Sequence, residues 1–119
     1  MALKDEVNQF LNDLKVKIET FGILFRDDRG KNQQTLYDLE ITPDQRKEII
    51  QKLRAEDYSG GPLQETLHGM RPLWVFGRVV RDREVYIKIS LGRFNECAVC
   101  ISFHLAESPM HYPFKTAKS

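Results

Sequence analysis

The chain has 119 residues, of which 41% are hydrophobic and 29% are charged, and its formal net charge is +1. This length fits a single domain, residues 1–119, and the composition excludes a disordered or a collagen-like chain. The sequence has no long uninterrupted apolar run, which excludes a membrane-spanning helix.

The amino-terminal residues and the cysteines indicate the cellular compartment. Residues 1–8 include the charged and polar residues Lys4, Asp5, Glu6 and Asn8 and do not resemble a secretory signal. The two cysteines, Cys97 and Cys100, are too few to staple a small secreted domain. We therefore expect a cytoplasmic protein with reduced thiols and without membrane association.

The spacing of Cys97 and Cys100 is also found in metal and redox sites, where the two sulfurs converge at a turn or at a helix start. Here both cysteines lie in a β-rich run, in which an offset of three residues sends side chains to opposite faces. We therefore expect this protein to use no metal and no cofactor.

The first part of the chain carries mostly helical patterns. Apolar residues at helical spacing predict an amphipathic helix over about residues 3–14 or somewhat beyond. A period-two alternation that leads into β-rich residues predicts a strand within 16–25. A short helix is expected over 33–39, with two leucines on its apolar side.

The clearest helix start is Thr42-Pro43-Asp44-Gln45, which combines an N-cap threonine, a proline at the first helical position and a capping-box glutamine. It predicts a helix over 43–54. The serine, glycines and proline within 57–62 predict that a flexible loop ends this helix.

Three β-rich runs fill most of the second half, at residues 73–80, 85–91 and 97–104. The segments between them have hairpin length, so the runs predict an antiparallel meander. Helices followed by a meander predict an α+β fold, with the amino-terminal helices packed on one face of a small antiparallel sheet. The proline-containing segment 108–114 is expected to cross this sheet as an ordered loop.

Side-chain alternation along the last two runs predicts which residues share a face. We expect the helices to cover the apolar face and the other face to carry Tyr86, Lys88 and His104. In the last run, the same alternation groups Cys100 with Ser102 and His104. A phenol, an ammonium and an imidazole on one surface indicate either a site with titratable groups or an outer sheet face that is merely polar.

The register of the last hairpin determines how close these side chains lie. If residues 91 and 97 close the hairpin, Glu84 lies opposite His104. His104 is then the diagonal neighbour of Tyr86 on the same face, at roughly 7–8 Å.

Positive charge is concentrated in the second half of the chain. Residues 1–60 have ten Lys and Arg against twelve Asp and Glu, whereas residues 61–119 have eight against five. A local cationic field of this kind attracts polyanions. Solvated charges at the turns of a strand pair explain the same pattern, so both interpretations stay open.

Several segments in a fixed order resemble a known family. They are Leu36-Tyr37-Asp38-Leu39, the predicted helix 43–54, Glu56-Asp57-Tyr58, Leu73-Trp74, Glu84-Val85-Tyr86-Ile87-Lys88-Ile89 and Ile101-Ser102-Phe103-His104. Their order and spacing resemble those of the MqsR (motility quorum-sensing regulator) toxins, which are RelE-like endoribonucleases of bacterial toxin–antitoxin pairs.

This resemblance implies a toxin that cleaves single-stranded mRNA without a metal, on or off the ribosome, and that pairs with a cognate antitoxin protein. The ribose 2′-OH attacks the adjacent phosphate, so the site must remove one proton, deliver another and stabilise negative charge. By position, Tyr86 matches the family's active-site tyrosine, and His104 falls where the family has a carboxy-terminal basic residue. The cations expected on the RNA phosphates are Lys88, which we also count as catalytic, and Arg78, Arg81, Arg83 and Arg93.

The chain departs from the family pattern at two positions. Ser59 stands where the family has a lysine, and Val75 stands where it has a glutamine. Two other functions therefore stay open, a non-catalytic protein-interaction module and a domain that binds RNA without cleaving it.

Overall fold

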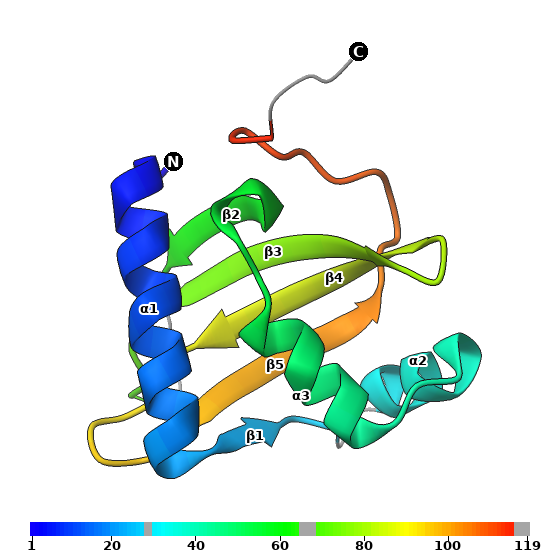
Figure 1. Cartoon of the computed structure of the whole chain (residues 1–119), viewed down its shortest axis with the longest axis horizontal. Coiled ribbons are helices and arrows are strands. Elements are labelled where there is room, and N and C mark those ends of the chain that lie inside the picture. Colours follow the sequence, from blue (N-terminus) through cyan, green and yellow to red (C-terminus); the bar gives the residue numbers. More distant parts are fainter. Residues whose placement is uncertain (28–29, 65–68, 116–119) are drawn as a thin grey trace.

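The computed structural model describes residues 1–27, 30–64 and 69–115, and its elements confirm the predicted α+β class. In chain order these elements are α1 (Lys4–Phe21), β1 (Ile23–Phe25), α2 (Lys31–Leu39), α3 (Pro43–Gln51), the short 3-10 turn η1 (Ala55–Asp57), β2 (Tyr58–Leu63), β3 (Leu73–Val80), β4 (Arg83–Ser90) and β5 (Ala98–Leu105). Figure 1 shows α1 and α3 lying across the sheet and α2 beside the end of β5.

The strands form one sheet in the order β1-β5-β4-β3-β2. Neighbouring strands from β2 to β5 pair antiparallel, but β1 pairs parallel to β5, so the sheet is mixed rather than purely antiparallel. β1 has only three residues, and so short a strand carries no sequence signal for its pairing direction. Its last residue, Phe25, pairs with Cys100 of β5.

Helix α1 continues beyond the minimum that apolar spacing predicts. Residues 15–19, which alternate with period two, belong to the helix, and Lys17 and Ile18 are buried on its inner side. Gly22 ends the helix with a φ of 83°, and its N–H donates to the Ile18 carbonyl oxygen at 2.8 Å. The strand expected within 16–25 is therefore limited to β1. No helix in the described ranges has the length and apolar character needed to cross a bilayer.

Helix α3 begins with the predicted capping box. The Gln45 N–H donates to Thr42 Oγ1 at 3.1 Å, and the Thr42 N–H donates to Gln45 Oε1 at 2.8 Å. Pro43 occupies the first turn, where its missing N–H is not needed. The helix ends at Gln51, which is earlier than the predicted end at residue 54.

Residues 57–62 are not the flexible loop that the sequence predicted, because most of them belong to β2 at the edge of the sheet. Tyr58 anchors this strand, since it pairs with Phe76 and is fully buried. Proline fits an edge strand because its missing N–H is not needed there. Gly61 is required by packing, since a Cβ would lie 2.7 Å from the Leu73 carbonyl oxygen. Glycine and proline thus mark an irregular edge strand here.

One face of the sheet carries the core. We call it the helix-covered face, and its fully buried side chains include Phe76, Val85, Ile87, Ile89, Cys100 and Phe103. α1 and α3 lie over this face in Figure 1, and their buried residues Val7, Phe10, Leu14 and Ile50 belong to the same apolar cluster. Removing this apolar surface from water stabilises the fold.

The opposite face, which we call the helix-free face, carries the polar side chains that the alternation predicted. Its central residues are Gly77, Tyr86, Lys88, Ser102 and His104. The register of β4 and β5 differs by two residues from the predicted one, so Tyr86 pairs directly with His104 instead of lying diagonal to it. Because a shift of two residues preserves the face, the three predicted side chains stay together and lie closer than expected.

A β-bulge at Ile101 changes which side chains of β5 face the core. Lys88 pairs with Ser102, whereas the next residue of β4, Ile89, pairs with Cys100, which leaves Ile101 unpaired. Cys100 is consequently fully buried on the helix-covered face, and the prediction that grouped it with Ser102 is wrong. Plain alternation contains no signal for an inserted residue.

The carboxy-terminal segment, residues 106–115, crosses the helix-free face, which confirms the crossing predicted for 108–114. Met110 and Tyr112 lie so close over Gly77 that any side chain at this glycine would collide with them. In Figure 1 this segment, in orange to red, leads from the end of β5 toward β2. The helix-free face is therefore partly covered by the chain itself.

Candidate active site

A cavity of about 520 Å³ opens on the helix-free face, between β4, β5 and the carboxy-terminal segment. Its walls are Ser59 of β2, Tyr86 and Lys88 of β4, Ser102 and His104 of β5, and residues 106–111. Tyr86, Lys88 and His104, which alternation placed on one face, therefore line one cavity.

Two aromatic rings and a cation form the floor of this cavity. The rings of Tyr86 and His104 stack, with centroids 5.3 Å apart and an angle of 16° between their planes. Lys88 Nζ lies 5.8 Å from the centroid of the Tyr86 ring. All three residues are half-buried where they line the cavity.

The main chain fixes the tautomer of His104. Its Nδ1 lies 3.0 Å from the carbonyl oxygen of Leu105. Because a carbonyl oxygen only accepts hydrogen bonds, we assign the proton of the neutral ring to Nδ1. The lone pair then lies on Nε2, which is the nitrogen that can take a proton from a bound molecule.

One carboxylate lies at the rim of the cavity and is held by helix α2. Lys31 Nζ donates to Glu107 Oε2 at 2.6 Å, and both side chains are exposed. This hydrogen bond and the charge of Lys31 lower the pKa of Glu107, and the nearby His104 acts in the same direction. Glu107 is therefore a permanent negative charge next to an imidazole at neutral pH.

Glu84 holds the wall formed by the carboxy-terminal segment. Its carboxylate accepts from the Met110 N–H at 3.2 Å and from the Tyr112 hydroxyl at 2.6 Å. Burial and this hydrogen bond raise the pKa of Tyr112, so its hydroxyl remains a donor. Across the cavity, Ser59 Oγ donates to the His111 carbonyl oxygen at 2.7 Å. The segment is thus fastened on both sides of the cavity.

None of the four arginines predicted to bind phosphate lines this cavity. Arg78 alternates with Gly77 and reaches the helix side of the sheet, where its Nη1 donates to the Lys52 carbonyl oxygen at 2.8 Å. The same nitrogen lies 3.4 Å from Asp57 Oδ2. Burial raises the pKa of Asp57, an effect that its hydrogen bond from the Arg54 main chain and the charge of Arg78 oppose.

The other three arginines lie at the two ends of β4. Arg81 belongs to the β3–β4 turn and Arg83 begins β4, and both are exposed. Arg93 follows the other end of β4, where its Nη1 lies 3.8 Å from Glu96 Oε1. That these three arginines bind RNA stays a prediction. An RNA strand bound to them would have to extend well beyond the cavity.

The cysteines occupy different environments and are both free thiols. Cys100 is fully buried, which raises the pKa of its thiol to about 12, whereas Cys97 is half-buried. In the part of the chain that the structure describes, no three His, Cys, Asp or Glu side chains are placed to hold a metal ion.

Sequence reasoning missed much of the cavity wall. The prolines of 108–114 predict a crossing, but they do not say that Met110 passes over β3 or that Glu107 reaches Lys31. Ser59 was noted only as a departure from the family pattern, although it lines the cavity. Recognising β2 as a strand would have placed Ser59 on the sheet.

Comparison with known proteins identifies no relative, since no family model, no curated protein and no solved structure matches this chain. The class that the fold itself defines is α+β, with helices packed on one face of a five-stranded mixed sheet.

Proposed function

We propose that this protein is an endoribonuclease toxin that cleaves single-stranded RNA by attack of a ribose 2′-OH on the adjacent phosphate. The observation that carries the proposal is the cavity in which Tyr86, Lys88 and His104 meet. The reaction needs a group that removes the 2′-OH proton, a group that protonates the leaving 5′-oxygen and positive charge for the phosphorane. We further propose that it acts on mRNA in the cytoplasm, independently of metal, with an antitoxin as its protein partner.

His104 is suited to the proton transfers. An imidazole exchanges its proton near neutral pH, which is the range where a general acid or base is most effective. The bond between Nδ1 and the Leu105 carbonyl oxygen leaves Nε2 available. Glu107 at the same rim stabilises the imidazolium that forms when Nε2 takes the 2′-OH proton.

Tyr86 and Lys88 are suited to the phosphate. The ammonium of Lys88 supplies a positive charge in the cavity, and a cation stabilises the dianionic phosphorane more strongly than the starting phosphodiester. The Tyr86 hydroxyl can donate a hydrogen bond to a phosphate oxygen or to the leaving oxygen. Its ring also stacks on His104, which holds the imidazole in a fixed orientation.

The positions that the resemblance singles out are consistent with one site. Tyr86 and His104 are separated along the chain but pair directly. Of the two departures, Ser59 lines the cavity, whereas Val75 pairs with Lys88 but is buried and does not line it. This placement supports the proposal, because Tyr86 and His104, to which the resemblance gives catalytic roles, line the same cavity.

A cleavage assay with purified protein and a short single-stranded RNA, run in EDTA, tests the proposal. We expect products that end in a 2′,3′-cyclic phosphate and a 5′-OH, because the 2′-OH is the nucleophile. An RNA with one 2′-deoxyribose at the cleaved position should stay intact. If the folded, unmodified protein leaves all RNA intact, the proposal is wrong.

Variants locate the activity in the cavity. We expect His104→Ala to lower the cleavage rate by at least about 100-fold, as for the loss of a general acid or base. Lys88→Gln should weaken binding and reduce its dependence on salt, because one phosphate contact fewer releases fewer counterions. Lys47→Gln is the matched control, because Lys47 is exposed on α3, which covers the other face of the sheet.

A protein-interaction module is a second candidate, because apolar side chains are exposed at the β1 edge of the sheet. Phe21 at the end of α1 and Leu24 in β1 are 44% and 51% exposed, and β1 is an edge strand. A partner that adds a strand to β1 would cover them. Stable binding of an antitoxin, lost in Leu24→Lys, together with no cleavage of RNA would favour this function over the nuclease.

A further inference from the structure

The β-bulge at Ile101 decides on which side of the sheet His104 lies. Cys100 is fully buried on the helix-covered face. In a regular strand that continued from Cys100, side chains would alternate, and His104 would face the same helices. The unpaired Ile101 reverses this order, so Phe103 enters the core and His104 joins Tyr86 in the cavity.

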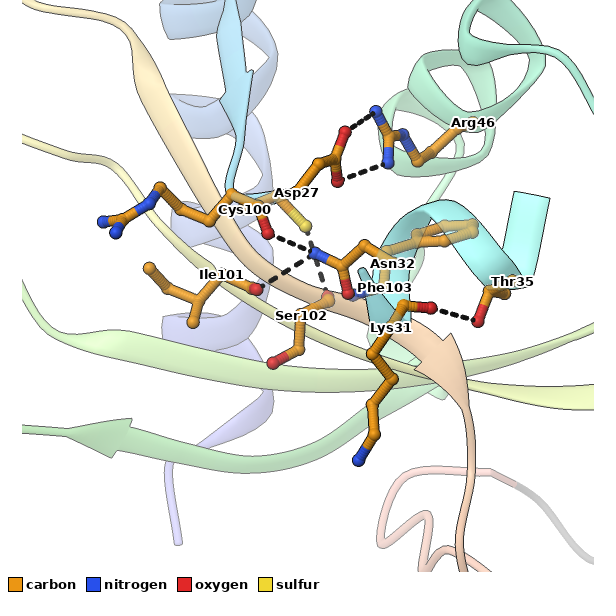
Figure 2. Close-up of polar contacts among 10 residues, drawn as sticks. Asp27, Lys31, Asn32, Thr35, Arg46, Cys100, Ile101, Ser102 and Phe103 are labelled. Atoms are coloured by element: carbon orange, nitrogen blue, oxygen red, sulfur yellow. Dashed lines mark hydrogen bonds and ion pairs between the residues drawn. The ribbon is translucent and has the colours of Figure 1, made fainter. Parts of the chain in front are cut away.

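One side chain, Asn32 in the first turn of α2, makes the contacts that hold this bulge (Figure 2). Its Nδ2 donates to the Ile101 carbonyl oxygen at 3.2 Å and to the Arg26 carbonyl oxygen at 2.7 Å. Its Oδ1 accepts from the Phe103 N–H at 3.0 Å. Asn32 is only 4% exposed, so these three bonds are shielded from water.

The carboxamide replaces a missing strand. β1 accompanies β5 only as far as Cys100, whose carbonyl oxygen accepts from the Arg26 N–H at 2.9 Å. The next main-chain groups on this edge of β5 belong to Ile101 and Phe103, and in a low-dielectric environment each would be costly without a partner. A primary amide offers two donors and an acceptor, and here Asn32 uses all of them.

The residues close to Asn32 in the chain contact both α3 and the rim of the cavity. Asp27, close before α2 in the chain, is bound by the guanidinium of Arg46 in α3 through two contacts of 3.0 Å, as Figure 2 also shows. Lys31, the neighbour of Asn32, holds Glu107 at the rim of the cavity. The first turn of α2 therefore contacts the chain both before and after His104.

We infer that Asn32 is a positioning residue for the candidate active site, because it holds the bulge that turns His104 into the cavity. The inference about the position of His104 depends on the structure alone. Only its consequence for RNA cleavage rests on the proposed function.

Asn32→Asp tests this inference with a side chain of the same shape. The carboxylate loses both donors and faces two carbonyl oxygens that it repels. In the unmodified protein, NMR should record a nuclear Overhauser effect between the ring protons of Tyr86 and His104, whose rings stack. We expect this signal to be lost or strongly weakened in Asn32→Asp.

Thr35→Val is the matched control. Thr35 is also buried in α2, and its hydroxyl donates to the Lys31 carbonyl oxygen at 3.0 Å rather than to β5. This variant removes a buried polar contact from the same helix, so it controls for a general loss of stability. It should keep the nuclear Overhauser effect between Tyr86 and His104.

The consequence for catalysis is measured separately. We expect Asn32→Asp to lower kcat by about 10- to 100-fold with little change in KM, because a misplaced general base slows the chemical step more than binding. In a His104→Ala background the same change should add little, since no imidazole is left to misplace. If Asn32 had only a structural role, Asn32→Asp would lower the activity of the unmodified protein and that of His104→Ala by the same factor.

Asn32→Gln provides a second variant in case Asn32→Asp does not fold. It keeps the amide but displaces it by one methylene, so we expect a weaker ring signal and a smaller loss in kcat. A folded Asn32→Asp or Asn32→Gln chain with an unchanged signal between Tyr86 and His104 overturns the inference. If the unmodified protein shows the signal but cleaves no RNA, the proposed function fails and the positioning of His104 is still judged by NMR.

Discussion

The two faces of the sheet use the same strands for different purposes. On the helix-covered face, Val85, Ile87 and Phe103 are fully buried against helices. On the helix-free face, Tyr86 and His104 alternate with these residues and remain half-buried at a cavity. Neighbouring residues of one strand therefore have opposite roles, because alternation sends one side chain into the core and the next to the candidate site.

The elements that lie over the two faces of the sheet also differ. Helices form a permanent layer over one face, whereas a single irregular segment crosses the other. The segment is held by polar contacts of Glu84 with Met110 and Tyr112 and by the ring of Phe114, which stacks on Tyr58. We therefore expect substitutions on the helix-covered face to change stability and those on the helix-free face to change the site.

The largest contrast is expected between two adjacent residues of β5. Phe103→Ala should lower the free energy of unfolding by about 3–5 kcal/mol, because it leaves a cavity in the core. His104→Ala should lower it by less than about 1 kcal/mol while removing RNA cleavage. Denaturant unfolding followed by circular dichroism measures both. Equal losses of stability would mean that the two faces are not energetically distinct.

Much of this arrangement could be predicted from the sequence, because it follows from local patterns. The capping box of Thr42 and Gln45 marks the start of α3, and period-two alternation groups Tyr86 with Lys88. These signals involve residues close together in the chain. They therefore need no knowledge of the tertiary structure.

The remainder depends on contacts between distant residues. The bulge at Ile101 is held by Asn32, about seventy positions earlier, and no pattern within β5 announces it. The cavity wall depends on Glu84, which accepts from a segment that follows the last strand. Such contacts determine the strand register and which segment covers the sheet. The predicted register and the predicted face of Cys100 were therefore wrong, whereas the shared face of Tyr86, Lys88 and His104 was confirmed.

A smaller effect is expected at the glycine beneath the carboxy-terminal segment. A Cβ at Gly77 would lie 2.7 Å from Met110 Sδ and closer still to the Tyr112 hydroxyl. Gly77→Ala should therefore displace the segment and destabilise the protein by about 1–3 kcal/mol, as overpacking does. Limited proteolysis within residues 106–115 should become faster.

Gly60→Ala is the matched control for this substitution. Gly60 lies in the neighbouring strand β2, and a Cβ there would meet only Val75, at an ordinary 3.8 Å. We expect its proteolysis pattern to match that of the unmodified protein. If Gly77→Ala is as stable and as resistant as Gly60→Ala, the segment does not pack on the helix-free face.

The hydroxyl of Tyr112 should contribute less, and its contribution should depend on pH. Tyr112→Phe removes the bond to Glu84, which we expect to cost about 1 kcal/mol at neutral pH. Burial and this bond raise the pKa of Tyr112 above its ordinary value of 10.0. The folded state thus keeps a proton that the unfolded state loses, so stability falls as the pH rises above 10.0.

Urea unfolding of the two chains at increasing pH measures this difference. We expect the advantage of the unmodified protein over Tyr112→Phe to be constant below the ordinary tyrosine pKa and to shrink above it. The difference between the two chains isolates Tyr112 from the other tyrosines. An advantage that grows in alkali would show that the hydroxyl does not donate to Glu84.

The smallest effect is expected at the rim of the cavity, where Lys31 and Glu107 are 58% and 72% exposed. Lys31→Gln should leave the midpoint of unfolding unchanged, because water screens such a pair. It should nevertheless move the pKa of Glu107 back toward its ordinary 4.5, because the hydrogen bond from Lys31 is the main cause of the lowering. Any stabilisation by the Lys31–Glu107 pair is present above pH 4.5 and is lost as the pH falls through the lowered pKa of Glu107.

Carbon-13 NMR of the Glu107 carboxyl group during an acid titration tests this expected change in pKa, with Lys47→Gln as the control. If Glu107 titrates identically in the unmodified and Lys31→Gln chains, Lys31 of α2 does not hold Glu107 at the rim of the cavity.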